Sequence, residues 1–310
     1  MNELAYSPPA VPDALTMTAG GHRAADSLAH KQALIESALD SYTEFPAECP
    51  RTLRDAIRYS LLTPGKRLRP MLVMLACEAC GGSAVKAVPA ACAVEMVHTY
   101  SLIHDDLPSM DDDNLRRGKP TCHRKYGEAV AILAGDALLA LAFETLANGI
   151  APADLALSCC ATLAHAAGPT ALVGGQCDDV LGDLTAGSLE MLEAIHNRKT
   201  GALFLASLRL GGLVASAPPP QLAALDRFGA NLGLAFQITD DLLDHHEGGR
   251  GCASKGKGDR GKLTYPNLIG FDQSRCVVER LIDASMSSLE PFGNGAGSLR
   301  ALARYVTDRL

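Results

Sequence analysis

The feature that most constrains the fold is a helical repeat of apolar residues, which begins near Ser27 and continues to the end of the chain. Alternating β-branched residues, which strands would need, are scarce. Gly, Pro, Asn and Asp separate the periodic stretches, as they do at helix ends. The pattern predicts an all-α domain with helices at roughly 28–43, 50–62, 67–80, 85–106, 126–148, 152–166, 188–213, 219–246, 273–289 and 296–308.

Hydrophobic residues make up 47% of the 310 residues, which is enough for one large core. We expect residues 1–26, which carry several Pro and Gly without apolar periodicity, to form a disordered tail before a single domain at 27–310. Several long helices are apolar over most of their surface and belong in the middle of a bundle. One of them, Ala129–Ala147, contains Asp136 and Glu144, so we expect a buried core helix and no membrane span.

The formal net charge of −7 gives the chain no general attraction for nucleic acid or anionic membranes. An anionic substrate must therefore be held by local basic residues or by bound cations. The ten cysteines form no disulfide framework, and the pattern of a secretory signal is missing, so a cytoplasmic location is expected. Cys77 and Cys80 form a C-x-x-C that could bind zinc, but no second pair follows, and buried thiols are the favoured interpretation.

Two acidic clusters carry the strongest functional signal. The second, Asp240-Asp241-Leu-Leu-Asp244, places Asp240 and Asp244 four residues apart on one helix face. Like charges in this arrangement repel each other, and a bound divalent cation would reverse the sign of that interaction. A single acidic run is usually a solvated helix face, whereas two such clusters in leucine-rich helices favour a metal site.

The first cluster is Asp105-Asp106-Leu-Pro-Ser-Met-Asp111. Asp105 and Asp111 are six residues apart, which a regular helix would place on different faces. Because Pro108 cannot continue a helix, we expect a local two-residue bulge that returns Asp111 to the face of Asp105. Carboxylates without thiolate or imidazole neighbours are hard oxygen ligands, which magnesium prefers.

Basic residues are spaced to face the first cluster. Lys66 and Arg69 share one face at the start of a predicted helix, and both could bind phosphate. His98 lies two turns before Asp105 on the same face. A ligand and a satisfied core histidine are both open interpretations of His98.

Further polar residues follow in the chain. Arg116 and Arg117 are adjacent and should point in different directions, so they could serve two different anions. Gln237 shares a helix face with the aspartates of the second cluster, and Lys199-Thr200-Gly201 lies in another predicted helix. Six glycines prevent a helix over Glu247–Lys262, which is either a surface loop or a flap that carries a lysine to an anion.

The order and spacing of these motifs resemble the trans-isoprenyl diphosphate synthases, most closely the farnesyl diphosphate synthases of bacterial type. The resemblance extends from about Ser27 to the C-terminus and is carried by GKRLRP (65–70), SLIHDDLPSMDDDNLRRGKPTCH (101–123), GGQCDD (174–179), RKTGAL (198–203), FQITDDLLD (236–244) and GKLTYPNLIG (261–270). It implies the isoprenoid synthase fold, which is a single bundle of ten or more helices around a deep central cavity. It also implies a homodimer that joins isopentenyl diphosphate head-to-tail to allylic diphosphates such as dimethylallyl and geranyl diphosphate.

The resemblance implies roles for individual residues as well. Three magnesium ions would be held by Asp105, Asp111 and Asp240, with Asp106, Asp241 and Asp244 as supporting or water-bridged ligands. The allylic diphosphate would be held by Arg116, Lys199 and a flap lysine, for which Lys255 is expected and Lys257 is the alternative. Isopentenyl diphosphate would be held by Lys66, Arg69, His98 and Arg117. The reacting allyl group would lie along Thr200 and Gln237, which with Lys199 form the catalytic set.

Product length is predicted from Tyr100 and Ser101, which lie five and four residues before Asp105. The resemblance implies that an aromatic residue at the fifth position is the floor of the channel in which the product grows. The prediction is therefore farnesyl diphosphate (C15). Geranylgeranyl diphosphate (C20) is the alternative, together with a packed core role for Tyr100, and a catalytically silent subunit is a third possibility.

Overall fold

The computed structural model describes residues 21–181, 187–248 and 263–309, and the side chains of 27–181, 187–243 and 263–309. Within these residues the chain is helical, apart from one short antiparallel hairpin of β1 (Leu115–Arg116) and β2 (Lys119–Pro120). The helices of the first half are α1 (Gly21–Tyr42), α2 (Arg51–Leu61), α3 (Leu68–Ala79), α4 (Val88–Asp105), α5 (Cys122–Tyr126), α6 (Glu128–Gly149) and α7 (Ala153–Ala167). Those of the second half are α8 (Leu172–Leu181), α9 (Leu189–His196), α10 (Ala202–Val214), α11 (Pro219–Gly248), α12 (Tyr265–Ile269), α13 (Phe271–Ser288) and α14 (Gly297–Thr307). Short turns of other helix types are η2 (Ala84–Ala87), η4 (Asn197–Gly201) and η6 (Glu290–Ala296).

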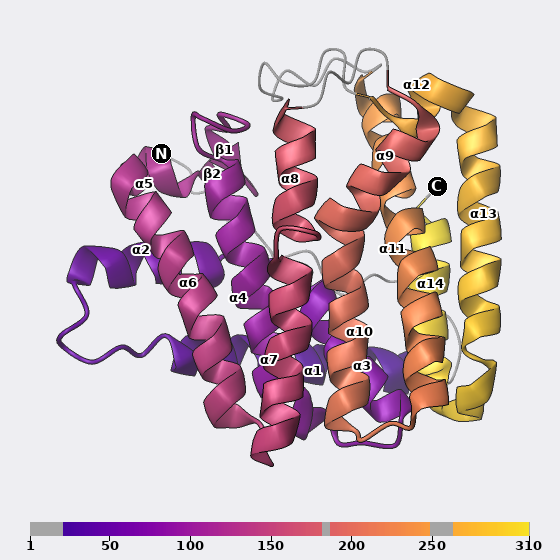
Figure 1. The fold of residues 1–310 in the computed structure, drawn as a ribbon, viewed down its shortest axis with the longest axis horizontal. Coiled ribbons are helices and arrows are strands. Elements are labelled where there is room, and N and C mark those ends of the chain that lie inside the picture. The colour runs from indigo at the N-terminus through magenta and orange to yellow at the C-terminus, as the bar shows by residue number, and fades with distance from the viewer. Residues whose placement is uncertain (1–20, 182–186, 249–262, 310) are drawn as a thin grey trace.

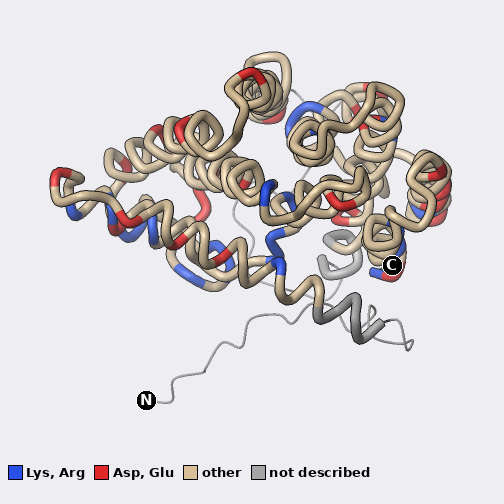
Figure 2. Tube along the Cα trace, turned by 90° about the horizontal axis from the view of Figure 1, so that it is seen from below, with Lys and Arg blue, Asp and Glu red and all other residues tan. Residues whose placement is uncertain are grey.

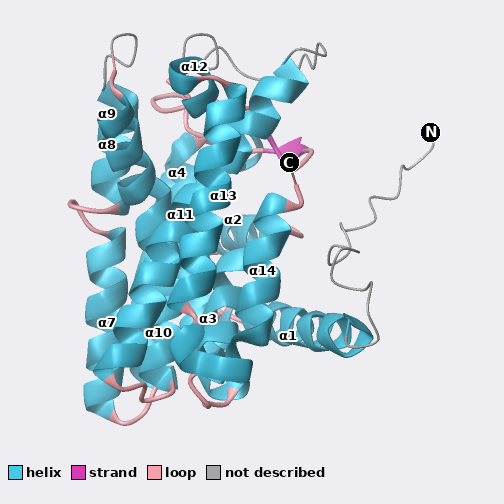
Figure 3. Ribbon diagram, turned by 90° about the vertical axis from the view of Figure 1, so that its right-hand side faces the viewer, coloured by secondary structure: helices cyan, strands magenta, loops and turns pink. Residues whose placement is uncertain are grey.

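The long helices run side by side in one bundle, with α4 packed mainly on α6, α10 on α3 and α11, and α11 on α13 (Figure 1). The hairpin that follows α4 and the short α12 that follows α11 lie at the same end of this bundle (Figure 1). Both acidic clusters are therefore carried to that end. Helix α1 lies crosswise to the bundle and protrudes from it (Figure 3).

The core is built from helices with few polar side chains. Nearly every residue of α4 from Ala90 to Ile103 is buried, and the buried parts of α3 and α10 pack beside it. Small residues let the helices approach closely: a Cβ on Gly135 of α6 would lie 2.2 Å from Nε2 of His104 on α4. The predicted all-α single bundle is confirmed.

Two boundaries differ from the prediction. Helix α1 begins at Gly21, so residues 21–26, which we expected in the tail, belong to the helix; no proline lies between Pro12 and Pro46 to interrupt it. Helix α8 lies between two of the expected helices and was not predicted; it contains Gly174 and Gly175, and glycine normally weakens a helix. Gly175 is in fact a packing residue, since a Cβ there would lie 2.4 Å from the backbone nitrogen of Lys199.

Helix α6 is only partly a core helix, which corrects the expectation of full burial. The helical stretches Glu128–Gly149 and Ala153–Leu181 have the length and hydropathy of membrane spans. In each, 39% of the most apolar 18 residues are buried in the bundle. Ile132, Leu133 and Leu157 are exposed apolar residues on α6 and α7. These two helices thus bury one side against the bundle and leave apolar residues on the other.

Charged residues of both signs are interspersed along the trace (Figure 2). The described cysteines are free thiols, and Cys77 is buried in α3. Cys77 Sγ lies 3.4 Å from the carbonyl oxygen of Ser83. Cys77 is thus part of the packing of α3, as predicted, whereas Cys80 is half-buried at the C-cap of this helix.

Candidate active site

The first acidic cluster forms where α4 ends. The predicted bulge within a continuous helix is wrong, because α4 stops at Asp105 and a turn follows. In this turn the backbone N–H of Asp111 donates to the carbonyl oxygen of Asp105 across 2.9 Å. Pro108 lies in the turn and explains why the helix cannot continue. The turn brings Asp111 back beside Asp105 without a bulge.

Burial and the charge of Asp111 both disfavour the ionised form of Asp105. Burial raises the pKa of Asp105 to about 6, and the charge of Asp111 adds to the rise while Lys199 opposes it. Burial acts to lower the pKa of Lys199, but nearby carboxylates raise it overall. Asp179 contributes most to this rise, and Asp105 and Asp111 add to it. The ammonium group thus lies among three carboxylates.

Lys199 is placed by an irregular helix turn. The segment η4 (Asn197–Gly201) is π-helical and connects α9 to α10, so Lys199 and Thr200 lie at a widened turn inside an otherwise regular helical run. Lys199 Nζ lies 2.6 Å from Oδ2 of Asp179 on α8. Thr200, like Gln237 on α11, is half-buried.

The two arginines of the hairpin point in different directions, as predicted. Arg117 and Gly118 both have positive φ, as a two-residue type I′ turn requires. Arg116 Nε donates to Oδ1 of Asp106 across 2.6 Å, and its Nη2 lies 3.4 Å from Asp113 Oδ2. Burial raises the pKa of Asp106 to about 6 against the opposing charge of Arg116. Arg117 instead reaches the loop before α3, with Nη1 at 3.4 Å from the carbonyl oxygen of Thr63.

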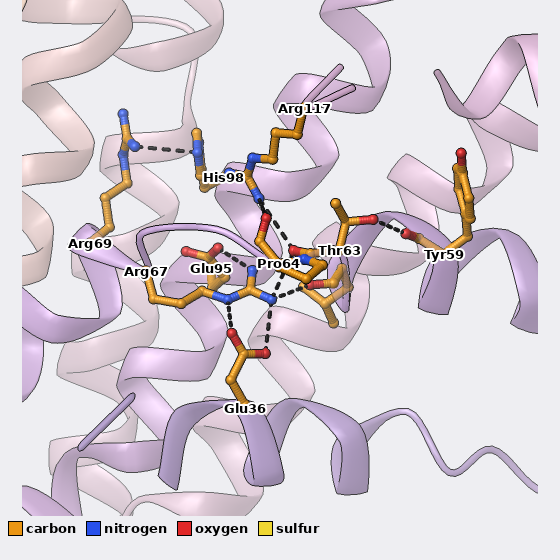
Figure 4. A network of polar contacts seen from close by, with 10 residues as sticks. Glu36, Tyr59, Thr63, Pro64, Arg67, Arg69, Glu95, His98 and Arg117 are labelled. Carbon is orange, nitrogen blue, oxygen red and sulfur yellow. Dashed lines mark hydrogen bonds and ion pairs between the residues drawn. The ribbon is translucent and has the colours of Figure 1, made fainter. Parts of the chain in front are cut away.

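A pocket of about 300 Å³ lies beside this loop. Its lining includes the four residues that were predicted to hold isopentenyl diphosphate, namely Lys66, Arg69, His98 and Arg117. Figure 4 shows Arg69 and His98 side by side, with Arg117 on the neighbouring segment. The structure therefore gathers residues from α3, α4 and the hairpin around one cavity.

The pocket is cationic without His98 being charged. Burial lowers the pKa of His98 well below its usual range, and the charges of Arg69 and Arg117 lower it further. Arg69 Nη1 lies 3.3 Å from His98 Nε2, and because arginine can only donate, Nε2 accepts. Burial lowers the pKa of Arg69 to about 10, so its guanidinium still carries a charge at neutral pH.

The second cluster is engaged with protein groups. Asp240 Oδ1 lies 2.8 Å from Nη2 of Arg309. Asp241 Oδ2 accepts from the backbone N–H of Tyr265 at 3.2 Å and lies 3.4 Å from His196 Nε2. The side chain of Asp244 and the flap candidates Lys255 and Lys257 lie outside the described residues.

Tyr100 and Ser101 lie one turn before the end of α4, as predicted. Tyr100 is 6% exposed, and its ring packs edge-on against His104 with the centroids 5.8 Å apart. Ser101 is buried and donates to the carbonyl oxygen of His98 across 2.9 Å. An aromatic ring therefore lies beneath Asp105 in the helix that carries the first cluster.

The donor set of the first cluster fits magnesium. Asp105 and Asp111 offer only oxygen, and the charge of Asp111 helps to raise the pKa of buried Asp105, an effect that a divalent cation would offset. Among the described residues, no three His, Cys, Asp or Glu side chains are already gathered around one point. Two carboxylates leave coordination positions of magnesium open to other donors, such as substrate oxygens or water.

Comparison with known proteins places this arrangement in a family. The family model of polyprenyl synthetases matches residues 50–287. The chain belongs to the polyprenyl synthetase family. This polyprenyl synthetase is 45% identical over 274 residues to geranylgeranyl pyrophosphate synthase 11, chloroplastic, of Arabidopsis thaliana, with 85% of this chain and 76% of that protein covered.

Two further comparisons agree. The chain is 43% identical over 293 residues to a dimethylallyltranstransferase of Fischerella ambigua, which covers 92% of this chain and 83% of that protein. The crystal structure of an FPP/GFPP synthase from Zymomonas mobilis matches with a TM-score of 0.84 and 34% identity, over 92% of this chain and 99% of that one. The protein is thus a prenyltransferase of the trans-isoprenyl diphosphate synthase type.

Some residues of this polyprenyl synthetase site were not singled out from the sequence. Asp179 and His196 contact predicted site residues, and Arg309 does so from the end of the chain. Asp179 lies in the GGQCDD segment, so a signal was present for it. His196 and Arg309 had no local signal, because their partners are distant in sequence.

Proposed function

We propose that this polyprenyl synthetase joins isopentenyl diphosphate head-to-tail to an allylic diphosphate, with magnesium as the cofactor. The observation that carries the proposal is the presence of two separate cationic groups at the same end of the bundle. Lys66, Arg69 and Arg117 surround one pocket, whereas Lys199 lies among the carboxylates of the first cluster. With magnesium bound to those carboxylates, both groups would be anion sites, which suits a reaction between two diphosphates.

The pocket beside the GKRLRP segment would hold isopentenyl diphosphate. Arg69 offers a planar fork of donors to phosphate oxygens, and Lys66 a mobile point charge. Neutral His98 accepts from Arg69 and so orients the guanidinium. These groups would place the double bond of isopentenyl diphosphate next to the allylic carbon.

The first cluster and Lys199 would hold the allylic diphosphate, and Asp240 would add a ligand from the second cluster. Bound to Asp105, Asp111 and Asp240, magnesium would neutralise the leaving diphosphate as its C–O bond breaks. Lys199 would add its charge to the same oxygens. Arg116, which is 33% exposed, would do so from the hairpin.

The remaining residues would act on the allylic cation. Thr200 in the π-helical turn and Gln237 on α11 would direct oxygen dipoles at it in a site that excludes water. Isopentenyl diphosphate would then attack, and the proton lost afterwards would pass to the released diphosphate. No side-chain base is assigned.

Product length has support from two different observations. Two proteins similar to this chain, one from Arabidopsis thaliana and one from Cyanophora paradoxa, are named geranylgeranyl synthases, which favours a C20 product. The buried ring of Tyr100 beneath Asp105 favours a C15 product. The named relatives favour a C20 product over the C15 product that the sequence predicted. Because of Tyr100, C15 stays the second candidate.

We also propose that two copies of the chain associate through α6 and α7. Leu133 and Leu157 are 56% and 70% exposed on these helices, and a second copy would cover them. Light scattering after gel filtration should give twice the mass of one chain, and Leu157→Lys should reduce it. A monomeric wild type would contradict the proposal.

The cytoplasmic location stays a prediction, because relatives include chloroplastic proteins.

One incubation tests the reaction. Purified protein is mixed with isopentenyl and dimethylallyl diphosphates, with magnesium or with a chelator, and the products are identified by mass spectrometry. We expect prenyl diphosphates only with magnesium, and the C15 to C20 ratio decides between the two products. The absence of any metal-dependent product would contradict the enzyme proposal and leave a silent subunit as the interpretation.

A further inference from the structure

The middle arginine of the GKRLRP segment, Arg67, also lines the predicted diphosphate pocket, but its guanidinium is bound to two glutamates. Arg67 is 2% exposed, whereas the neighbouring Lys66 is exposed and Arg69 is half-buried at the pocket. Arg67 has a φ of 46°, in the left-handed region that non-glycine residues rarely adopt. Such a backbone conformation persists only where surrounding contacts hold it. The turn that separates Lys66 from Arg69 thus depends on what Arg67 binds.

The guanidinium of Arg67 uses all three of its nitrogens. Its Nε and Nη2 donate to the two carboxylate oxygens of Glu36 on α1, at 2.7 and 3.0 Å. Its Nη1 donates to Oε1 of Glu95 on α4 at 2.6 Å, and Nη2 also reaches the carbonyl oxygens of Leu61 and Thr63. Figure 4 shows this fork between the two glutamates. Arg67 therefore ties α1, the end of α2 and α4 to the turn before α3.

Glu95 is the reason why this contact matters for the pocket. Its side chain is 3% exposed, and it lies one helical turn before His98 on α4. It lines the same pocket as Lys66 and Arg69, and its charge acts on the pKa of Arg69. A buried carboxylate beside a diphosphate site would compete with the substrate for cations unless it had its own partner.

Arg67 supplies that partner. Burial acts to lower its pKa, but the hydrogen bonds and charges of Glu36 and Glu95 raise it, so the guanidinium stays charged. With Oε1 of Glu95 bound to Arg67, the carboxylate is directed to the inner side of the turn. Arg69 is then left to contact His98 and to stack on the ring of Phe204, 5.0 Å from its centroid.

We propose that Arg67 is a positioning residue for the isopentenyl diphosphate pocket: it holds the turn and neutralises Glu95, so that Lys66 and Arg69 remain available to the substrate. The inference rests on the proposed function. It assigns different roles to the three basic residues of one segment, with the outer two binding substrate and the middle one keeping them free.

The test compares the KM values for the two substrates. Arg67→Met should raise the KM for isopentenyl diphosphate at least tenfold and leave that for the allylic diphosphate within about twofold, because Lys199 and the first cluster are untouched. Glu95→Gln in the same chain should restore most of the loss, since it removes the unpaired charge. Equal changes in both KM values, or no rescue by Glu95→Gln, would overturn the proposal.

Two variants guard against a general loss of structure. Glu36→Gln removes one carboxylate that is 36% exposed, so the chain should fold, and it should raise the KM for isopentenyl diphosphate alone by about two- to threefold. Arg58→Met breaks the Arg58–Asp40 ion pair between α2 and α1, away from the pocket, and should change neither KM. A selective rise with Arg58→Met, or none with Glu36→Gln, would count against the proposal.

Titration calorimetry of isopentenyl diphosphate into the metal-free protein gives a second measurement. Arg67→Met should weaken this binding about tenfold, and Glu95→Gln should recover it. If the wild type forms no product, the proposed function fails. If the wild type is active and the variants bind isopentenyl diphosphate normally, the role of Arg67 fails alone.

Discussion

Arg309 Nη2 lies 2.8 Å from Asp240 Oδ1, so the penultimate residue of the chain is ion-paired with the first aspartate of the second acidic cluster. The guanidinium also lies over the ring of Phe236, 5.3 Å from its centroid. The side chains of Arg309 and Asp240 are 16% and 34% exposed, so solvent screens the pair only in part. A metal ion that binds Asp240 must therefore compete with Arg309.

The first prediction concerns this competition. Arg309→Gln should bind magnesium several-fold more tightly, because an ion pair of this exposure is worth about 1 kcal/mol and would no longer be broken on binding. Titration calorimetry without substrate measures the change. Arg300→Gln is the matched control, since Arg300 lies on α14 shortly before Arg309, and within the described residues its guanidinium bonds the carbonyl oxygens of Gly293 and Leu289. Unchanged or weaker magnesium binding by Arg309→Gln would contradict the competition.

The second prediction is a pH dependence of the metal effect. Burial raises the pKa values of Asp105 and Asp106 to about 6, above the value of about 3.9 expected in the unfolded chain. Between about pH 4 and 6 the folded, metal-free protein thus binds more protons than the unfolded chain. The contribution of these groups to the free energy of unfolding is largest below this window and falls as the pH rises through it.

Magnesium needs the deprotonated carboxylates, so its effect has the opposite pH dependence. The increase in Tm caused by magnesium should be full at pH 8 and lost by pH 5. Thermal unfolding at several pH values, with magnesium and with a chelator, measures it. Asp105→Asn should show little magnesium effect at any pH. An equal increase at pH 5 and pH 8 in the wild type would be inconsistent with these pKa values.

The fold could be predicted because the patterns that define it are local. Helix α3 (Leu68–Ala79) and helix α13 (Phe271–Ser288) end within two residues of the predicted positions, since their boundaries coincide with turn and cap residues. Helix α8 was missed because glycine normally weakens a helix. Gly175 is needed because the backbone of η4 lies too close for a side chain at this position. Sequence alone cannot show that contact.

The site could be predicted only in part, for a related reason. The shared face of Lys66 and Arg69 follows from spacing within a short segment, and the family resemblance implied that His98 joins them at one pocket. The inward direction of Arg67 depends on Glu36, which is 31 residues away, and on a positive φ. Because this residue is an arginine and not a glycine, the sequence gives no sign of that positive φ. The pair of Arg309 and Asp240 spans 69 residues. Such partners are decided by the packing of whole helices.

The third prediction tests the close approach of α8 and η4. Gly175→Ala would place a Cβ 2.4 Å from the nitrogen of Lys199, and because the neighbour is backbone, one helix must shift. Overpacking of this kind costs about 1–3 kcal/mol, which corresponds to a decrease in Tm of several degrees. The condensation activity should fall even at temperatures at which the variant is still folded, because Lys199 and Thr200 are displaced.

Gly297→Ala is the control for that substitution. Apart from Gly297 itself, its chain neighbours and the backbone of its own helix, no described atom lies within 4 Å of the added Cβ, and Gly297 has ordinary helical φ and ψ at the start of α14. It should leave both Tm and activity close to wild type. Thermal unfolding and the condensation assay on the two variants together measure the effect. A Gly175→Ala protein as stable and active as Gly297→Ala would show that α8 adjusts freely.

The fourth prediction concerns product length. Tyr100 is buried in α4, five residues before Asp105, where a growing apolar chain would descend from the first cluster. Tyr100→Ala removes the ring and should increase the share of products longer than those of the wild type. The variant should be less stable by about 3 kcal/mol or more, because a large buried side chain is lost. Mass spectrometry of the products measures the shift.

Tyr100→Phe separates the ring from its hydroxyl group. Among the described residues the buried hydroxyl has no hydrogen-bond partner, so its removal should cost little. The ring and its edge-on contact with His104 would remain, and the product distribution should match that of the wild type. If Tyr100→Phe alters product length while Tyr100→Ala does not, the ring is not the floor of the channel. If only Tyr100→Ala lengthens the product, the volume of this one ring limits elongation.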